Sequence, residues 1–328
     1  MDGGPAIPRV EAPKPSTAKH GWKGILAFLT VYLVWGSTFL AIRYAVATIP
    51  PLFVAATRHL IAGSILLAWA LGRGERPTWQ GVQAGLVLGA LFFLISHGTL
   101  HWAEQFVPSG VAALVIATQP VFVALMLPWF RLGGPPSGKT YAGLALGIGS
   151  VLALFRPDVA TSRLANVGLV AVLISSIAWS AGIVLSRKVQ PKTAGTMNAA
   201  LPLLCGSLML LVAGVVCGEH RQLHLAAVTT KSFLGLLYLV VFGSLLAFVA
   251  YTWLLRHYPP TLVATHTYVN PLVAVALGWL VAGEPMSISV ILSAGLAISA
   301  IGLVNSGSRD GANPVAEVGG NIGRQDVP

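Results

Sequence analysis

Two amide–proline pairs carry the clearest potential for binding a solute. Gln119-Pro120 and Asn270-Pro271 each lie within a long apolar run that contains no Asp, Glu, Lys or Arg. Proline removes a backbone N–H and frees the carbonyl one turn earlier, and a membrane tolerates such irregular backbone where it lines a cavity or packs on protein. The amide beside each break could therefore coordinate a polar solute. Alternatively, both pairs are structural kinks whose amides hydrogen-bond to neighbouring helices.

Two arginines fall inside or at the end of apolar runs. Arg58 lies in the run 51–71, about 10 Å from its start at the helical rise of about 1.5 Å per residue. A cation inside a membrane is costly, so it indicates a functional role or a partner within the bundle. Snorkelling to the surface is the alternative for Arg58. It is the preferred interpretation for Arg43, at the end of the first run.

Histidines supply the remaining candidates. His97, His101 and Glu104 are spaced to share one helical face, which could hold a metal or relay protons. No further metal ligands are evident in the sequence, so we expect no metal and prefer a polar rim at the external mouth. His266 lies one turn before Asn270, with Tyr268 between them, so it could contact the solute or cap a polar seam.

Two patterns suggest enzymes and are set aside. Residues 133–140 satisfy the Walker A spacing, but that motif needs a preceding strand and a following helix, and here it joins two apolar runs. The acidic residues all fall in tails, loops or ends of runs, with no convincing catalytic pair. We therefore predict no enzyme and no cofactor. Without a carboxylate deep in the membrane, we expect exchange, uniport or proton coupling through His97 or His266.

Composition indicates a membrane protein. The chain of 328 residues is 55% hydrophobic and 9% charged, with a mean hydropathy of +0.78. Soluble domains carry about 25% charged residues because their surface faces water, so lipid must cover this chain. The net charge of +10 does not indicate nucleic-acid binding, because the basic residues are scattered between apolar runs instead of gathered on one face.

The apolar runs predict ten membrane-spanning helices. About 18 to 20 residues suffice to cross the bilayer. The expected spans are 24–42, 51–71, 77–103, 105–130, 139–155, 164–186, 193–218, 232–255, 257–283 and 285–308. Residues 1–22 and 307–328 are expected to be disordered cytoplasmic tails.

The basic residues predict that both termini are cytoplasmic, because Lys and Arg accumulate in cytoplasmic loops. With that orientation, the outer loops hold only Arg156, Arg163, Arg221 and Lys231. Every other Lys or Arg, except Arg43 and Arg58 within spans, then falls on the inside. The even number of spans agrees with this topology.

The two halves of the chain repeat each other. At one constant spacing, the residues that coincide are Trp102 with Trp253, Pro108 with Pro259, Gln119 with Asn270 and Pro120 with Pro271. At a second spacing, Trp35 coincides with Trp179 and Arg43 with Arg187. Each half, 23–156 and 164–306, then holds five spans, and an odd number inserts the second half upside down. Inverted repeats are typical of secondary transporters.

Several of these motifs resemble the EamA-domain repeats of the drug/metabolite transporter superfamily. They are Trp35-Gly36-Ser37-Thr38-Phe39 followed by Arg43, Pro50-Pro51 with Arg58, Pro108-Ser109-Gly110 with Gln119-Pro120, and Tyr268-Val269-Asn270-Pro271 with Gly283-Glu284. The resemblance covers roughly residues 22–306. It implies ten helices with both termini inside, in a bacterial inner membrane, and a lining role for Trp35, Ser37 and Thr38. The first half departs from the pattern, with Leu132-Gly133-Gly134 where many relatives carry Leu-Gly-Glu.

The expected fold is therefore an all-α membrane protein of two inverted five-helix repeats. The expected function is export or exchange of small organic metabolites, amino-acid-like or anionic or zwitterionic, by alternating access. A channel, a non-transporting membrane scaffold and an intramembrane enzyme are the alternatives. The expected partners are a small-molecule substrate and the lipid bilayer, and glycines spaced four apart (Gly81, Gly85 and Gly89) could pack spans together or form a homodimer contact.

Overall fold

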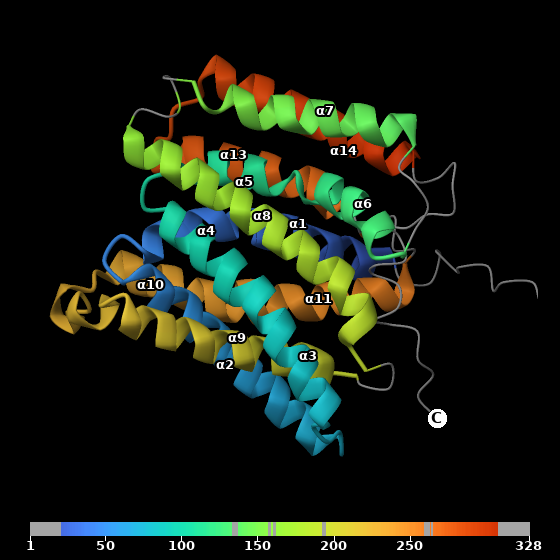
Figure 1. The fold of residues 1–328 in the computed structure, drawn as a ribbon. Coiled ribbons are helices and arrows are strands. Elements are labelled where there is room, and N and C mark those ends of the chain that lie inside the picture. Colours follow the sequence, from blue (N-terminus) through green and yellow to red (C-terminus); the bar gives the residue numbers. More distant parts are fainter. Residues whose placement is uncertain are drawn as a thin grey trace, which may run out of the picture.

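A computed structural model describes residues 21–132, 137–156, 159, 162–191, 195–258, 263 and 265–307. Within these ranges every regular element is helical and none is a strand. Figure 1 shows the helices packed side by side along their lengths. Residues 1–20 and 308–328 of the predicted tails, and residues 133–136 of the Walker-like stretch, lie outside the described ranges. The ends of the predicted tails that are described, Gly21, Trp22 and Gly307, belong to helices and correct the expectation of disorder there.

The first half of the chain forms five helical segments. They are α1 (Gly21–Ala45), α2 (Pro51–Gly72), α3 (Trp79–Gly89) continued by the π-helix η2 (Ala90–His97) and α4 (Gly98–Ala103), α5 (Ser109–Ile116) followed by α6 (Gln119–Trp129), and α7 (Gly138–Ala153). Ser137 starts α7 by accepting a hydrogen bond from the Thr140 N–H, which is ordinary N-capping.

The second half has a similar order of elements. They are α8 (Arg163–Val189), α9 (Met197–Val216), the 3₁₀ turns η3 (Glu219–Arg221) and η4 (Leu225–Ala227), α10 (Thr230–Tyr238) continued by the π-helix η5 (Leu239–Leu246) and α11 (Ala247–His257), α13 (His266–Ala282) and α14 (Ile288–Gly307). Each half thus carries a π-helix within its third segment.

In the part of the chain that the structure describes, seven helices are long and apolar enough to cross a membrane. They are Trp22–Ala45, Pro51–Gly72, Trp79–Ala103, Ser109–Trp129, Arg163–Val189, Met197–Val216 and Thr230–Tyr251. His266–Ala282 and Ile288–Val304 are shorter apolar helices. The expectation of an all-helical membrane protein is confirmed at this level. Exposed Trp22, Trp79 and Trp129 lie at ends of their spans, where tryptophan favours the membrane–water interface.

Glycines allow the helices to approach closely. A Cβ added to Gly89 of α3 would lie 2.7 Å from the Gly206 backbone nitrogen of α9. A Cβ added to Gly143 of α7 would lie 2.8 Å from the Ala300 carbonyl of α14. The prediction that these glycines pack spans together is confirmed, as small residues do between membrane helices.

Replacing Gly89 by alanine should therefore destabilise the protein. The new methyl group would meet backbone that cannot move without separating α3 from α9, and overpacking costs about 1–3 kcal/mol. Gly302→Ala in α14 is the matched control, since its added Cβ meets nothing within 4 Å, and alanine in an open helix stabilises by about 0.5–1 kcal/mol. Thermal unfolding in detergent should rank Gly302→Ala above the parent and Gly89→Ala below it. Equal melting of the two variants would contradict this packing.

Helices α2 and α9 are joined by exchanged carboxylate caps. Glu75, which follows α2, accepts hydrogen bonds from the Thr196 and Met197 N–H groups at the start of α9, at 3.2 and 2.8 Å. Glu219, which follows α9, accepts hydrogen bonds from the Leu52 and Phe53 N–H groups at the start of α2, at 3.0 and 3.3 Å. The two helices therefore run antiparallel, and each carboxylate satisfies free N–H groups at the positive end of the other helix.

Candidate functional site

Arg58 of α2 is turned into the bundle. Its side chain is 7% exposed, and its Nε donates a hydrogen bond to Ser244 Oγ of η5 at 2.8 Å. Gly243 makes room for this contact, because a Cβ there would lie 3.3 Å from Arg58 Nη2 and 3.0 Å from Thr38 Cγ2. Arg58 therefore has a partner inside the bundle and does not snorkel.

The predicted lining residues of α1 face the same π-helical span. Trp35 Nε1 donates to the Gly243 carbonyl at 3.2 Å, and the Trp35 ring lies against His266, with 5.2 Å between ring centroids. Ser37 Oγ shares a hydrogen bond of 2.7 Å with the Tyr238 hydroxyl. A π-helix widens the turn and leaves backbone groups free for such contacts, often at functional sites.

A chain of three histidines lies beside Arg58. His59 Nε2 and His97 Nδ1 share a hydrogen bond of 2.8 Å, and His101 Nδ1 bonds to the His97 carbonyl at 2.7 Å. Trp179 of α8 stacks on the His97 ring, with 5.3 Å between centroids. We call His59, His97 and His101 the histidine chain. Trp35 and Trp179, which coincide in the sequence repeat, each contact the π-helix of the opposite half.

The expectation of an external polar rim is wrong for His101 and Glu104. These side chains are 0% and 1% exposed, because α4 packs against both α2 and α8. Glu104 directly follows the span Trp79–Ala103, so it lies at the end of a span as expected from the sequence, but neighbouring helices bury it. Sequence spacing placed these residues on one face but could not show which helices cover that face.

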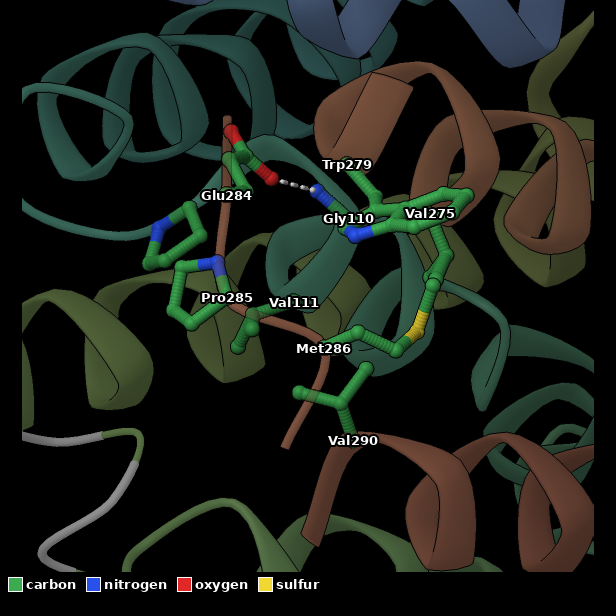
Figure 2. Close-up of a pocket in the computed structure, with 9 residues that line it drawn as sticks. Gly110, Val111, Val275, Trp279, Glu284, Pro285, Met286 and Val290 are labelled. Carbon is green, nitrogen blue, oxygen red and sulfur yellow. Dashed lines mark hydrogen bonds between the residues drawn. The ribbon is translucent and has the colours of Figure 1, made fainter. Parts of the chain in front are cut away.

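A second buried carboxylate, Glu284, follows α13 and caps α5. It accepts hydrogen bonds from the Ser109 N–H and Oγ, both at 2.8 Å, and from the Gly110 N–H at 3.1 Å. Gly283, with φ of 65°, makes the left-handed turn that brings it there. Figure 2 shows the Glu284 carboxylate directed at the Gly110 nitrogen, above a small cavity lined by Trp279 and other apolar side chains.

Arg43 completes this end of the bundle. Its Nη1 lies 3.1 Å from Glu284 Oε1 and donates to the Val107 carbonyl at 3.3 Å. The side chain is 37% exposed, so it reaches the surface while remaining paired. The snorkelling interpretation therefore missed its main contact. Arg43 and Glu284 join α1, α5 and the end of α13, and we call this pair the Arg43–Glu284 clamp.

The amide–proline pairs lie in two separate helix contacts. With its amide nitrogen turned toward them, Asn270 donates to the carbonyls of Tyr32 and His266 at 3.2 and 3.1 Å. The backbone carbonyl of Gln119 accepts a hydrogen bond from Ser180 Oγ of α8 at 3.2 Å. Pro120 and Pro271 are buried. Asn270 thus bonds to α1 and Gln119 to α8, the first helices of the two halves.

The Tyr268 hydroxyl donates a hydrogen bond to the Ile301 carbonyl of α14 at 3.2 Å. The structure adds His59, Ser244 and Trp179 to the residues around Arg58. His59 directly follows Arg58 in the sequence, and Trp179 coincides with Trp35 in the repeat. Those two signals could have identified them, whereas nothing in the sequence distinguishes Ser244 from other membrane serines.

Comparison with known proteins identifies the family. The EamA-like transporter family matches residues 22–156 and again 166–306. An uncharacterized inner membrane transporter of Escherichia coli, YedA, is 36% identical over 284 residues, covering 86% of this chain and 90% of YedA. Protein PecM of Dickeya dadantii is 32% identical, covering 77% of this chain and 82% of PecM.

More distant similarities agree with this assignment. A probable amino-acid metabolite efflux pump of Escherichia coli is 26% identical, covering 85% of this chain and 95% of the pump. One crystal structure shares the fold with a TM-score of 0.59 at 19% identity, covering 88% of this chain and 98% of the solved one. The chain belongs to the EamA-like transporter family of the drug/metabolite transporter superfamily.

Proposed function

We propose that this protein is a secondary transporter that exports or exchanges small organic metabolites by alternating access. The observation that carries the proposal is the exchange of caps between α2 and α9. Glu75 and Glu219 coincide at the same sequence spacing that pairs Trp35 with Trp179. Glu75 follows α2 and caps α9, whereas Glu219 follows α9 and caps α2, the equivalent helix of the other half. Such reciprocity is what a two-fold axis in the membrane plane produces.

Further contacts support two inverted five-helix repeats, 23–156 and 164–306. The π-helices η2 and η5 occupy the same place in their halves, and each contacts the tryptophan of the other half's first helix. Helix α1 packs on α13 and α11, as α8 packs on α6 and η2. Adding the shorter helices α7, α13 and α14 to the seven longer ones gives ten proposed spans. Both termini then lie on the cytoplasmic side of a bacterial inner membrane.

The proposed solute is amino-acid-like, or more broadly anionic or zwitterionic. Arg58 is a buried cation whose hydrogen-bond partner, Ser244, is neutral, so the guanidinium can still receive a carboxylate. The rings of Trp35 and Tyr251, with centroids 5.0 Å apart, lie near Arg58. In this proposal they face the ammonium group of a zwitterion. The Escherichia coli relative named as an amino-acid metabolite efflux pump agrees with this class.

The proposed path also includes Asn270, which can be tested by profiling metabolites in spent medium. Cells expressing the parent, Asn270→Ala or no protein are compared at matched membrane levels. Asn166→Ala is the control, because the exposed Asn166 side chain donates to the Ser162 carbonyl, in its own helix cap at the start of α8. We expect a solute enriched outside with the parent and the control, and reduced about tenfold with Asn270→Ala, since an amide hydrogen bond to a polar solute is worth about 1.4 kcal/mol. Identical profiles for parent and empty cells would contradict export.

A further inference from the structure

Glu104 is an acid in the interior whose carboxylate has no hydrogen-bond partner in the part of the chain that the structure describes. It is 1% exposed, and neither Oε1 nor Oε2 is hydrogen-bonded within the described part of the chain. Each of the other three acids in described loops, Glu75, Glu219 and Glu284, caps a helix. An ionised carboxylate that is buried without partners costs several kcal/mol and normally takes up a proton. Glu104 therefore differs from the capping acids in having no hydrogen bond from the described residues to stabilise its ionised form.

Charged groups from several elements act on Glu104. Helix α1 provides Arg43, helix α2 provides Arg58, and the segment after α13 provides Glu284. His101 precedes Glu104 by one turn on α4, and His59 of α2 is joined to it through His97. Arg43, Arg58 and Glu284 act on Glu104 electrostatically, and Arg58 acts on the histidine chain. Helix α8 contributes apolar Leu169 and Val172 to the core packed around α4.

Two carboxylates thus lie near one arginine, and only one of them is paired with it. Arg43 bonds to Glu284 at 3.1 Å, whereas Glu104 forms no salt bridge with any residue that the structure describes. A neutral Glu104 does not attract the charge of Arg43. An ionised Glu104 does attract it, and the low dielectric constant of the protein interior strengthens this attraction. The protonation state of Glu104 therefore decides whether Arg43 stays with Glu284.

We propose that Glu104 is a binding site for the coupling proton, and that its occupancy controls the Arg43–Glu284 clamp. With the proton bound, the clamp holds α1 against α5 and α13. Release of the proton draws Arg43 toward Glu104, and the clamp opens. His101, one helical turn before Glu104, has an Nε2 without a partner among the described residues, and the histidine chain runs from His101 through His97 to His59, which adjoins Arg58.

This inference rests on the proposed function for its role in coupling, but the proton site can be tested without any solute. The infrared carbonyl band of protonated carboxyl groups is measured in purified protein at neutral pH. We expect the parent and the control Glu75→Gln to share a band that Glu104→Gln lacks. Equal spectra for parent and Glu104→Gln would overturn the proton site and leave the transporter proposal intact.

Opening of the clamp is measured by thiol labelling. Val111→Cys places a buried thiol beside the Glu284 cavity, Cys205 is replaced by serine, and exposed Cys217 remains as the internal reference. A buried and an exposed thiol titrate differently, so the ratio of the two labelling rates is compared with the same ratio in Glu104→Gln carrying both thiols. Between acidic and alkaline pH, we expect the ratio to rise at least about tenfold more in the parent than in Glu104→Gln.

The variant Glu104→Asp protects the test against misfolding, because it keeps a carboxyl group and should keep the pH response. A pH response that persists unchanged in Glu104→Gln would overturn the control of the clamp by Glu104. A flat ratio in the parent would overturn it too.

Discussion

Replacing Arg58 by methionine is expected to abolish solute export while the protein remains folded. Methionine fills a similar volume, and replacing a buried charge by an apolar residue is often neutral or stabilising. Among the described residues, Ser244 is the one that loses a hydrogen-bond partner. A carboxylate-bearing solute would lose its counterion, so export of the metabolite found by profiling should fall at least about 100-fold, which corresponds to about 2.8 kcal/mol.

The control for this variant is Arg163→Met, which removes an exposed arginine at the start of α8. Its export rate should match the parent at equal membrane levels. Thermal unfolding of Arg58→Met in detergent should lie within about 1 kcal/mol of the parent, the usual range for volume-conserving changes. Undiminished export by Arg58→Met would assign Arg58 a packing role only.

Glu284→Ala is expected to be the most destabilising single substitution among the capping acids. It removes three hydrogen bonds to the start of α5 and the partner of Arg43. Hydrogen bonds to a charged group contribute about 1.5–3 kcal/mol each. The ion pair contributes less to the free energy of unfolding, because the Arg43 side chain is partly exposed to solvent. We expect a total loss on the order of 3 kcal/mol, measured by denaturant or thermal unfolding in detergent.

Glu284→Gln separates part of these contributions, because the amide oxygen can still accept both hydrogen bonds from Ser109. The amide nitrogen at the other position cannot accept from the Gly110 N–H, and the charge is lost. This variant should lie between the parent and Glu284→Ala. Arg43→Ala, which leaves the α5 cap in place, should cost less than Glu284→Ala. If Glu284→Ala unfolded at the parent temperature, the capping role of Glu284 would be refuted.

The sequence predicted the helical membrane fold because its signals are local. Apolar runs, scattered charge and paired tryptophans can be recognised without knowing which helices touch. The exchanged caps could have been predicted, because Glu75 and Glu219 fall at the repeat spacing of Trp35 and Trp179. The π-helices could not have been predicted, because their hydrogen-bond pattern depends on packing against the opposite half and no residue type specifies it.

The candidate site was predicted in part for the same reason. Arg58, Trp35, Thr38 and His97 were singled out by type and position, and their contacts converge on the two π-helices. Burial of Glu104 could not be foreseen, because it depends on the coverage of α4 by α2 and α8. A loop acid and a buried acid have the same sequence signature when the neighbouring helices are unknown.

The central claim, alternating movement of two inverted halves, is tested most directly by two spin-label distances. One pair, Gln105 and Val281, lies at the end that carries Glu284, and the other, Gln80 and Lys188, lies at the opposite end; all four side chains are exposed. Each pair joins one residue from each half, on a background lacking Cys205 and Cys217. Alternating access predicts two distance populations at each end that shift in opposite directions when pH or solute changes. A single fixed distance at both ends, or both ends widening together, would contradict the account.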